Sequence, residues 1–121
     1  MVRRDERDTG TVTSDEDRAT NDGLVVRDEP TASRYEARFG DTVAAFSEYR
    51  SLPGRLVFVH TVTAPEFAGR GIADRLARGL LDDVRARGLK VTPICEYIAG
   101  YIARHPEDAD LVSFGRERHR A

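Results

Sequence analysis

The hydrophobic pattern of this chain changes its period near Pro65, and that change limits what the chain can fold into. Before it, polar and apolar residues alternate over Arg34–Phe39, and Leu56–Val59 is a continuous apolar run. Alternation is typical of a half-buried strand, and a short continuous run is typical of a strand buried on both faces. After it, apolar side chains recur every four residues, at Ile72, Leu76, Leu80 and Val84. This spacing predicts an amphipathic helix.

The residues after this helix complete a strand–helix–strand unit. Gly88 is suited to end the helix, and Leu89–Ile94 has the composition of another strand. Strands joined through a helix are expected to be parallel, with a right-handed crossover. Further on, Tyr97–Arg104 predicts a short second helix that stops before Pro106, and Leu111–Phe114 predicts a last strand.

Two turns join the strands that precede the long helix. Phe39–Thr42 carries glycine at the first central position of a type II′ turn, so the strand from Val43 to about Tyr49 returns antiparallel. Leu52–Arg55 carries proline and glycine at the second and third positions of a type II turn. With an apolar run at Leu24–Val26, the order of elements predicts an α+β fold, in which an antiparallel meander is extended by one βαβ unit.

Composition divides the 121 residues into three parts. Residues 1–23 hold seven acidic side chains, four arginines and four apolar side chains, which predicts a disordered acidic tail. Residues 24–114 contain the periodic segments and are expected to form one domain, followed by a basic C-terminal end at 115–121. A domain of this size has one modest core, so a ligand site is expected to be shallow or shared with a partner.

Charge and composition exclude several classes of function. A formal net charge of −2 gives no basic field to attract nucleic acid. No apolar run is longer than the four residues of Leu56–Val59, far fewer than the ~20 residues that span a bilayer, so no membrane partner is expected. The N-terminus has no apolar segment of a signal peptide, and the expected location is the cytoplasm. The single cysteine, Cys95, excludes an internal disulfide and a cysteine-based zinc site, and no metal is expected.

Two glycines, Gly69 and Gly71, lie at the start of the predicted long helix, where backbone N–H groups have no partner within the helix. Glycine lets the backbone approach a bound oxyanion, the helix dipole favours phosphate there, and Arg70 is placed to add a charged contact. The segment therefore fits a pyrophosphate cradle, although two glycines also simply permit a tight strand-to-helix turn. It lacks the third glycine of a dinucleotide-binding fingerprint and the Gly-Lys-Ser/Thr of a nucleotide-triphosphate loop.

Four blocks of sequence, taken in order, resemble the compact GNAT-type N-acetyltransferases, a small single-domain group of the GNAT superfamily. The blocks are His60–Thr63, Pro65–Ala73, Gly88–Cys95 and Tyr101–Pro106. The resemblance covers roughly residues 24–114 and implies a GNAT-like mixed sheet with two main helices and acetyl-CoA as the acetyl donor. One position departs from the superfamily pattern, because Glu66 stands where the loop has Arg or Gln. The cradle is therefore expected to consist of backbone N–H groups.

The resemblance implies two groups of residues that bind the acetyl donor. The pantetheine arm would lie in a wedge where the strand around Thr61, Val62 and Thr63 parts from the strand around Val91–Ile94, since splayed strands leave backbone groups that an amide-rich arm satisfies. The diphosphate would lie on Gly69, Arg70, Gly71, Ile72 and Ala73. Arg104 is a further phosphate contact in this interpretation, or else a cap for the negative end of its own helix.

His60, Cys95 and Tyr101 are the candidate catalytic residues, and each has a structural alternative. His60 would accept a proton from the acceptor amine, or is a half-buried histidine bonded to the backbone. Cys95 would accept the acetyl group or, as we favour, protonate the departing CoA sulfur; otherwise it only fills space. A tyrosine hydroxyl that faces the sulfur is a common general acid in the superfamily, and Tyr97 or Tyr101 would supply it; otherwise both rings only pack.

The function implied by the resemblance is acetyl-CoA-dependent N-acetylation of a primary amine, on a small molecule or a protein, by direct attack in a ternary complex. The alternatives are a CoA-binding module without turnover, acting as a sensor, and an interaction protein whose glycines only form a turn. Helices that wall the acceptor site in larger members do not fit into the short Asp28–Ser33 connection, so the acceptor is not identified. Glu48 and Glu96 are either contacts for its ammonium group or solvated acids. A monomer or weak homodimer is expected.

Overall fold

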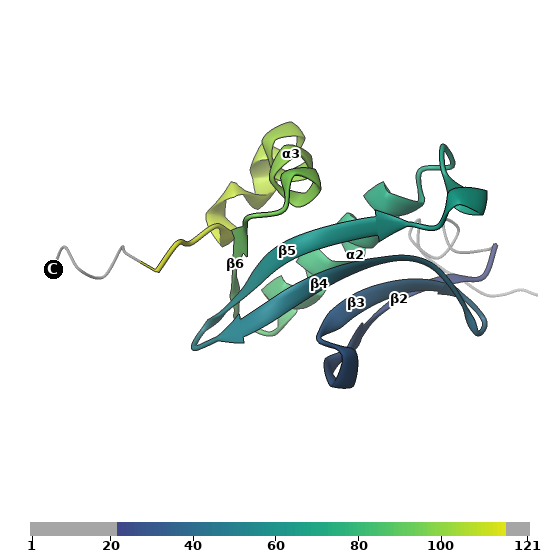
Figure 1. Cartoon of the computed structure of the whole chain (residues 1–121). Helices are drawn as coiled ribbons and strands as arrows, with labels where there is room; N and C mark the ends of the chain where they lie inside the picture. Colours follow the sequence, from purple (N-terminus) through teal and green to yellow (C-terminus); the bar gives the residue numbers. More distant parts are fainter. Residues whose placement is uncertain (1–21, 116–121) are drawn as a thin grey trace, which may run out of the picture.

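A computed structural model describes residues 22–115, and its centre is a five-stranded sheet whose strands lie side by side in sequence order (Figure 1). The strands are β2 (Leu24–Glu29), β3 (Arg34–Phe39), β4 (Thr42–Leu52), β5 (Arg55–Thr63) and β6 (Lys90–Pro93). Strands β2 to β5 are antiparallel neighbours, and β6 is parallel to β5. This arrangement confirms the predicted meander extended by one βαβ unit.

The two hairpin turns follow the predicted glycine chemistry. Gly40, between β3 and β4, has a φ of 59°, and Gly54, between β4 and β5, has a φ of 79°. Glycine adopts this left-handed conformation at little cost, whereas other residues are strained by it. The strands pair directly across both turns, so each turn sets the register of its hairpin.

Helices and short 3-10 turns complete the fold. They are η2 (Pro30–Ala32), η3 (Pro65–Phe67), α2 (Ile72–Ala86), α3 (Glu96–Arg104) and η4 (Pro106–Leu111). The long helix α2 packs on one face of the sheet through the stripe that its four-residue period predicts: Ile72, Leu76, Ala77, Leu80, Leu81 and Val84 are buried. At Gly79 the helix comes so close to β2 that an added Cβ would lie 2.7 Å from Val26.

The other face of β2–β5 carries no helix within residues 22–115, and we call it the open face (Figure 1). The only segment between β2 and β3 is the single turn η2, as the short connection predicted. Strand alternation and the pairing register assign the open face its side chains. They include Arg27, Arg34, Glu36, Arg38, Phe46, Glu48, His60 and Val62.

The C-terminal part differs from the prediction. In place of a strand over Leu111–Phe114, the 3-10 segment η4 is followed by a single parallel bridge between Val91 and Val112. Arginines on α2 hold Asp108, which lies within η4. The chain therefore reaches β6 only after η4 ends, and only this single bridge forms. The sequence pattern did not include this tertiary contact, so the strand prediction was wrong.

The predicted acidic tail and basic end lie almost wholly outside the described residues. Asp22, near the end of the predicted tail, is described, and its carboxylate lies 2.8 Å from the guanidinium group of Arg75 on α2. In the part that the structure describes, no helix has both the length and the apolar character needed to cross a membrane.

Asp108 joins η4 to α2 and is the most buried acidic group of this contact. Its side chain is 2% exposed and accepts hydrogen bonds from Nη1 and Nη2 of Arg78 at 2.8 and 3.0 Å. Nη2 of Arg85 lies 3.4 Å away. The hydrogen bonds from Arg78 hold the pKa of Asp108 below its usual value of 3.8.

We expect Asp108→Asn to lower the free energy of unfolding at neutral pH by about 1–3 kcal/mol, because a paired carboxylate is lost while Arg78 stays partly exposed. Urea denaturation measures this. A carboxyl whose pKa is lowered in the folded state stabilises the fold above its unfolded pKa and loses this contribution as the pH falls through the folded pKa. The difference in free energy of unfolding between the original protein and the Asp108 variant should therefore shrink below about pH 4.

Asp110→Asn, at an exposed partner of Arg85, is the control and should leave stability unchanged. An equal loss of stability in both variants would contradict the role given to Asp108.

Candidate functional site

The ladder between β5 and β6 ends halfway along β5. The strands pair over Arg55–Phe58 and Lys90–Pro93, and a last bond runs from Cys95 N to Phe58 O at 2.8 Å. Beyond it β6 leads into α3, while β5 continues with β4 alone beside it (Figure 1). Over residues 60–63 the edge of β5 therefore faces no strand of the described chain. The wedge was predicted at this edge.

A β-bulge at Val59 determines which way the following side chains point. Phe58 and His60 pair with consecutive residues of β4, so Val59 is an extra residue in β5. Because side chains alternate along a strand, an extra residue reverses their order. Phe58 therefore lies in the core and His60 on the open face, where it is exposed. Thr61 faces the side covered by α2.

Three small polar groups form a chain on the α2 side of this junction. The hydroxyls of Ser47 and Thr61, which pair across β4 and β5, are 2.9 Å apart, and the Thr61 hydroxyl is 3.1 Å from the Cys95 sulfur. Ser47 is fully buried and Cys95 is 8% exposed. Thr61, predicted as a backbone contact for the pantetheine arm, thus also has a hydroxyl in contact with the thiol. Ser47 was not predicted; its only sequence signal is a hydroxyl at a core-facing position of β4.

His60 and Cys95 lie on opposite sides of β5, at the level where β5 and β6 part. No hydrogen bond joins these two residues in the described chain. An acceptor on the open face would meet His60 first, whereas a thiol arm entering from the α2 side would meet Cys95 first. The arrangement is suited to a reaction in which two groups approach a common point from different faces of the sheet.

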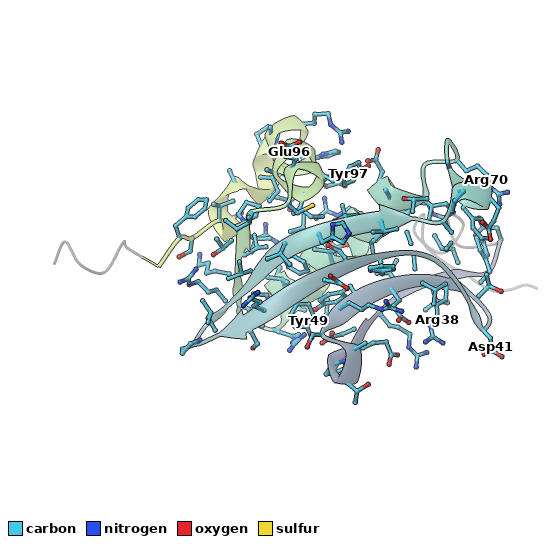
Figure 2. All side chains as sticks on the ribbon, in the orientation of Figure 1. Arg38, Asp41, Tyr49, Arg70, Glu96 and Tyr97 are labelled. Atoms are coloured by element: carbon cyan, nitrogen blue, oxygen red, sulfur yellow. The ribbon has the colours of Figure 1, made fainter. Side chains whose placement is uncertain are left out.

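The glycine segment lies between the end of β5 and the start of α2. Gly69 and Gly71 have φ of 78° and 74°, and an added Cβ at either would meet nothing within 4 Å. Gly71 is the N-cap of α2, and within residues 22–115 no side-chain hydrogen bond caps this end of the helix. The exposed side chain of Arg70 lies near the ring of Phe67, 5.0 Å from its centroid (Figure 2). Ile72 and Ala73 contribute the first amides of the helix, which have no partner within the helix and are suited to an anion.

Asp74, in the first turn of α2, contacts α3. Its carboxylate accepts a hydrogen bond from the hydroxyl of Tyr97 and lies 3.4 Å from Arg104. These bonds lower the pKa of Asp74, that from Tyr97 most. Burial, then the bond to Asp74, raises the pKa of Tyr97 to about 12. The fold thus brings Arg104 to the first turn of α2 through Asp74, and the Tyr97 hydroxyl is occupied by the same carboxylate.

Tyr101 lies apart from this junction. Its ring is 4% exposed and stacks on His105 with centroids 3.9 Å apart. Nη1 of Arg78 on α2 lies 3.5 Å from its hydroxyl. Burial raises the pKa of Tyr101. No contact within the described chain brings Tyr101 to His60 or Cys95, so the structure unites two of the three candidate catalytic residues at the junction and not the third.

The acidic residues near the junction are separate from one another. Glu48 is half-buried and lies directly opposite His60 on the open face, while Glu96 is exposed at the start of α3 (Figure 2). Among residues 22–115 no three side chains of His, Cys, Asp and Glu gather as metal ligands would. Val62 and Thr63 extend the edge of β5 beyond Thr61 and are half-buried.

Comparison with known proteins identifies the family. A sequence model of GCN5-related N-acetyl-transferases matches residues 34–111, from β3 to the end of η4. This span includes the parting strands, the glycine segment and α3. The chain belongs to the GCN5-related N-acetyl-transferase family. No curated protein has significant sequence similarity to it.

Two solved structures are similar to this chain at low sequence identity. The solution structure of a GCN5-like protein from Staphylococcus aureus, described as a candidate N-acetyltransferase, matches with a TM-score of 0.58 and 16% identity, over 75% of this chain and 89% of that chain. The crystal structure of the ribosomal-protein-S18-alanine N-acetyltransferase from Escherichia coli has a TM-score of 0.46 and 15% identity, over 67% of this chain and 49% of that chain. The first match confirms the GNAT-like fold, and at this identity it concerns the fold alone.

Replacing Thr61 by valine tests the hydroxyl–thiol chain. The valine keeps the shape of the side chain but leaves the Ser47 hydroxyl and the Cys95 thiol without their partner, so we expect the free energy of unfolding to fall by about 1–2 kcal/mol. Urea denaturation measures it, with Thr42→Val, at an exposed position of β4, as the control. Equal stability of the Thr61 variant and the original protein would show that these contacts do not hold the thiol.

Proposed function

We propose that this protein is an acetyl-CoA-dependent N-acetyltransferase that transfers the acetyl group to a primary amine by direct attack in a ternary complex. The observation that carries the proposal is the parting of β5 and β6 beside an uncapped helix N-terminus, in a chain that belongs to the GCN5-related family. The free edge of a strand is suited to an amide-rich arm, and free helix amides are suited to a diphosphate.

In this proposal, acetyl-CoA supplies an activated thioester and the chain positions it. The backbone of Thr61, Val62 and Thr63 would bind the pantetheine arm as an added strand. The amides of Gly69, Gly71, Ile72 and Ala73 would receive the diphosphate, with Arg70 and Arg104 as charged contacts. The pairing of Arg104 with Asp74 limits its strength as a phosphate contact.

The two sides of β5 would divide the proton transfers. His60, on the open face, accepts the proton that the amine loses as its nitrogen attacks the thioester carbon. A backbone N–H of Thr61 or Val62 stabilises the oxyanion. When the carbon–sulfur bond breaks, the Cys95 thiol, held by Thr61, gives its proton to the departing sulfur and is reprotonated from solvent. Because the Tyr101 hydroxyl contacts Arg78, we assign the acid role to Cys95.

Gly71→Ala tests the diphosphate cradle. A side chain at a φ of 74° costs about 1–2 kcal/mol of stability and stands beside the helix amides. We expect the dissociation constant of CoA, measured by calorimetry, to rise about tenfold or more. Gly54→Ala is the matched control, because Gly54 has a similar φ of 79° and equally open space, yet lies in the β4–β5 turn. An unchanged affinity of the Gly71 variant would contradict the cradle.

His60→Gln tests catalysis. Loss of the proton acceptor should lower kcat for an amine about 10²–10⁴-fold, with the affinity for acetyl-CoA unchanged. His105→Gln, at the other histidine within the described residues, should keep kcat near its original value. Binding of CoA without thiol release for any amine would instead identify a CoA-binding module.

Intact mass after incubation with acetyl-CoA alone tests direct transfer. We expect no covalent product, because the thioester needs no enzyme-bound intermediate. A gain of roughly 42 Da located on Cys95 would make Cys95 a nucleophile and overturn the direct route.

A further inference from the structure

Three charged residues on β3 form a compact triad on the open face. Arg34, Glu36 and Arg38 alternate with Tyr35 and Ala37, which face the core. The Glu36 side chain is 3% exposed, and its two carboxylate oxygens each lie 2.7 Å from an arginine Nε. Burial alone would raise the pKa of Glu36, but the bonds from both arginines outweigh it, and the pKa lies below its usual value. The triad carries a net positive charge.

The arginines bond to Glu36 through their Nε atoms, and this leaves their Nη groups available. Within residues 22–115 no partner binds the Nη atoms of Arg34 or Arg38, whose side chains are 27% and 28% exposed. The guanidinium group of Arg34 also lies over the Phe46 ring, 4.2 Å from its centroid. Arg38 lies on β3, the same strand as Arg34 (Figure 2). Both guanidinium groups are therefore held in place before any ligand arrives, which reduces the entropy lost on binding.

The energy of the ion pairs alone does not account for this triad. Buried ion pairs are often no more stabilising than apolar side chains of similar volume, because the charges must be removed from water. A buried carboxylate that orients two guanidinium forks is, however, an effective way to present fixed donors to an oxyanion, since planar forks match the geometry of carboxylate and phosphate.

The triad is connected to the candidate catalytic residue by a row across the sheet. Arg34 pairs with Glu48 on β4, and Glu48 pairs with His60 on β5. Two strand spacings, about 10 Å in all, therefore separate the backbones of Arg34 and His60. No ion pair engages Glu48 within the described residues. Along the row a positive group is followed by a negative group next to the proton acceptor, which complements an acceptor with an ammonium group at one end and an oxyanion at the other.

We propose that Arg34, Glu36 and Arg38 form an oxyanion site on the open face, and that the acceptor is an amine bearing a carboxylate or phosphate group. The oxyanion binds the Nη groups of the two arginines, and the ammonium group lies toward Glu48 and His60. The identification of this ligand as the acceptor rests on the proposed function, whereas the anion site itself rests on the triad.

The test compares matched amines as acceptors for the full chain. One series contains ω-amino acids of increasing length with the alkylamines of equal length, and another contains aminoalkyl phosphates with the corresponding amino alcohols. We expect kcat/KM to be about tenfold to a hundredfold higher for the anionic member at the best length. The two series distinguish carboxylate from phosphate.

Variants assign the preference to the triad. Arg34→Gln combined with Glu36→Gln removes one charge of each sign and should abolish the preference while the KM for acetyl-CoA stays the same. Arg38→Lys keeps the ion pair but loses the fork, so KM for anionic acceptors should rise with kcat unchanged; it also serves if the double variant does not fold. Arg27→Gln, at an exposed arginine on the same face, is the control and should keep the preference.

Two results would overturn the proposal: equal kcat/KM for every matched pair, or a preference that survives in both triad variants.

If CoA binds but no amine is acetylated, the proposed function fails, and the binding of an anion to the triad is then measured directly. Titration with glutarate and with inorganic phosphate should shift the Nε–Hε resonances of Arg34 and Arg38 to saturation in nitrogen-15 spectra. Absence of these shifts would overturn the oxyanion site itself.

Discussion

The rest of the site depends on where β5 and β6 stop pairing. The last pair is Phe58 with Pro93, and proline has no N–H with which to continue a ladder. The chain turns at once after Pro93, where Ile94 N donates to Thr92 O at 3.2 Å, and the next residue, Cys95, is the N-cap of α3. One residue type at the end of a four-residue strand thus leaves an unpaired edge on β5 and places the thiol beside it.

The bulge at Val59 gives this junction two chemically different sides. If β5 ran through Val59 without a bulge, His60 would face α2 and Thr61 the open face, because the alternation would continue from Phe58. With it, the histidine is exposed and the threonine bonds to Cys95. In the proposed reaction the amine and the departing sulfur are handled from opposite sides of one strand, so neither proton transfer obstructs the other.

The parts of the fold that local sequence determines were predicted correctly, and the parts that depend on contacts between distant residues were not. The two turns follow from the conformational freedom of Gly40 and Gly54, and α2 follows from its apolar period. The bulge at Val59 has no local signal, because it arises from the register between two strands. Glu36 has the sequence signature of a solvated position, yet arginines two residues away on either side bury it. The strand predicted over Leu111–Phe114 failed for the same reason, since a contact to α2 decides the path of that segment.

The described part of the chain also has to keep the second face of its sheet compatible with water, because the single turn between β2 and β3 supplies no helix to cover it. Arginine suits such a face, since its aliphatic stem covers apolar surface while its head stays wet. Here the guanidinium group of Arg34 lies over Phe46, and the charge that this introduces is balanced in part by Glu36. The same residues that make an uncovered sheet face stable in water therefore hold guanidinium groups rigidly within two strands of His60. In the proposed reaction, the sheet surface takes the place of an acceptor wall, and an acceptor can be selected there by charge.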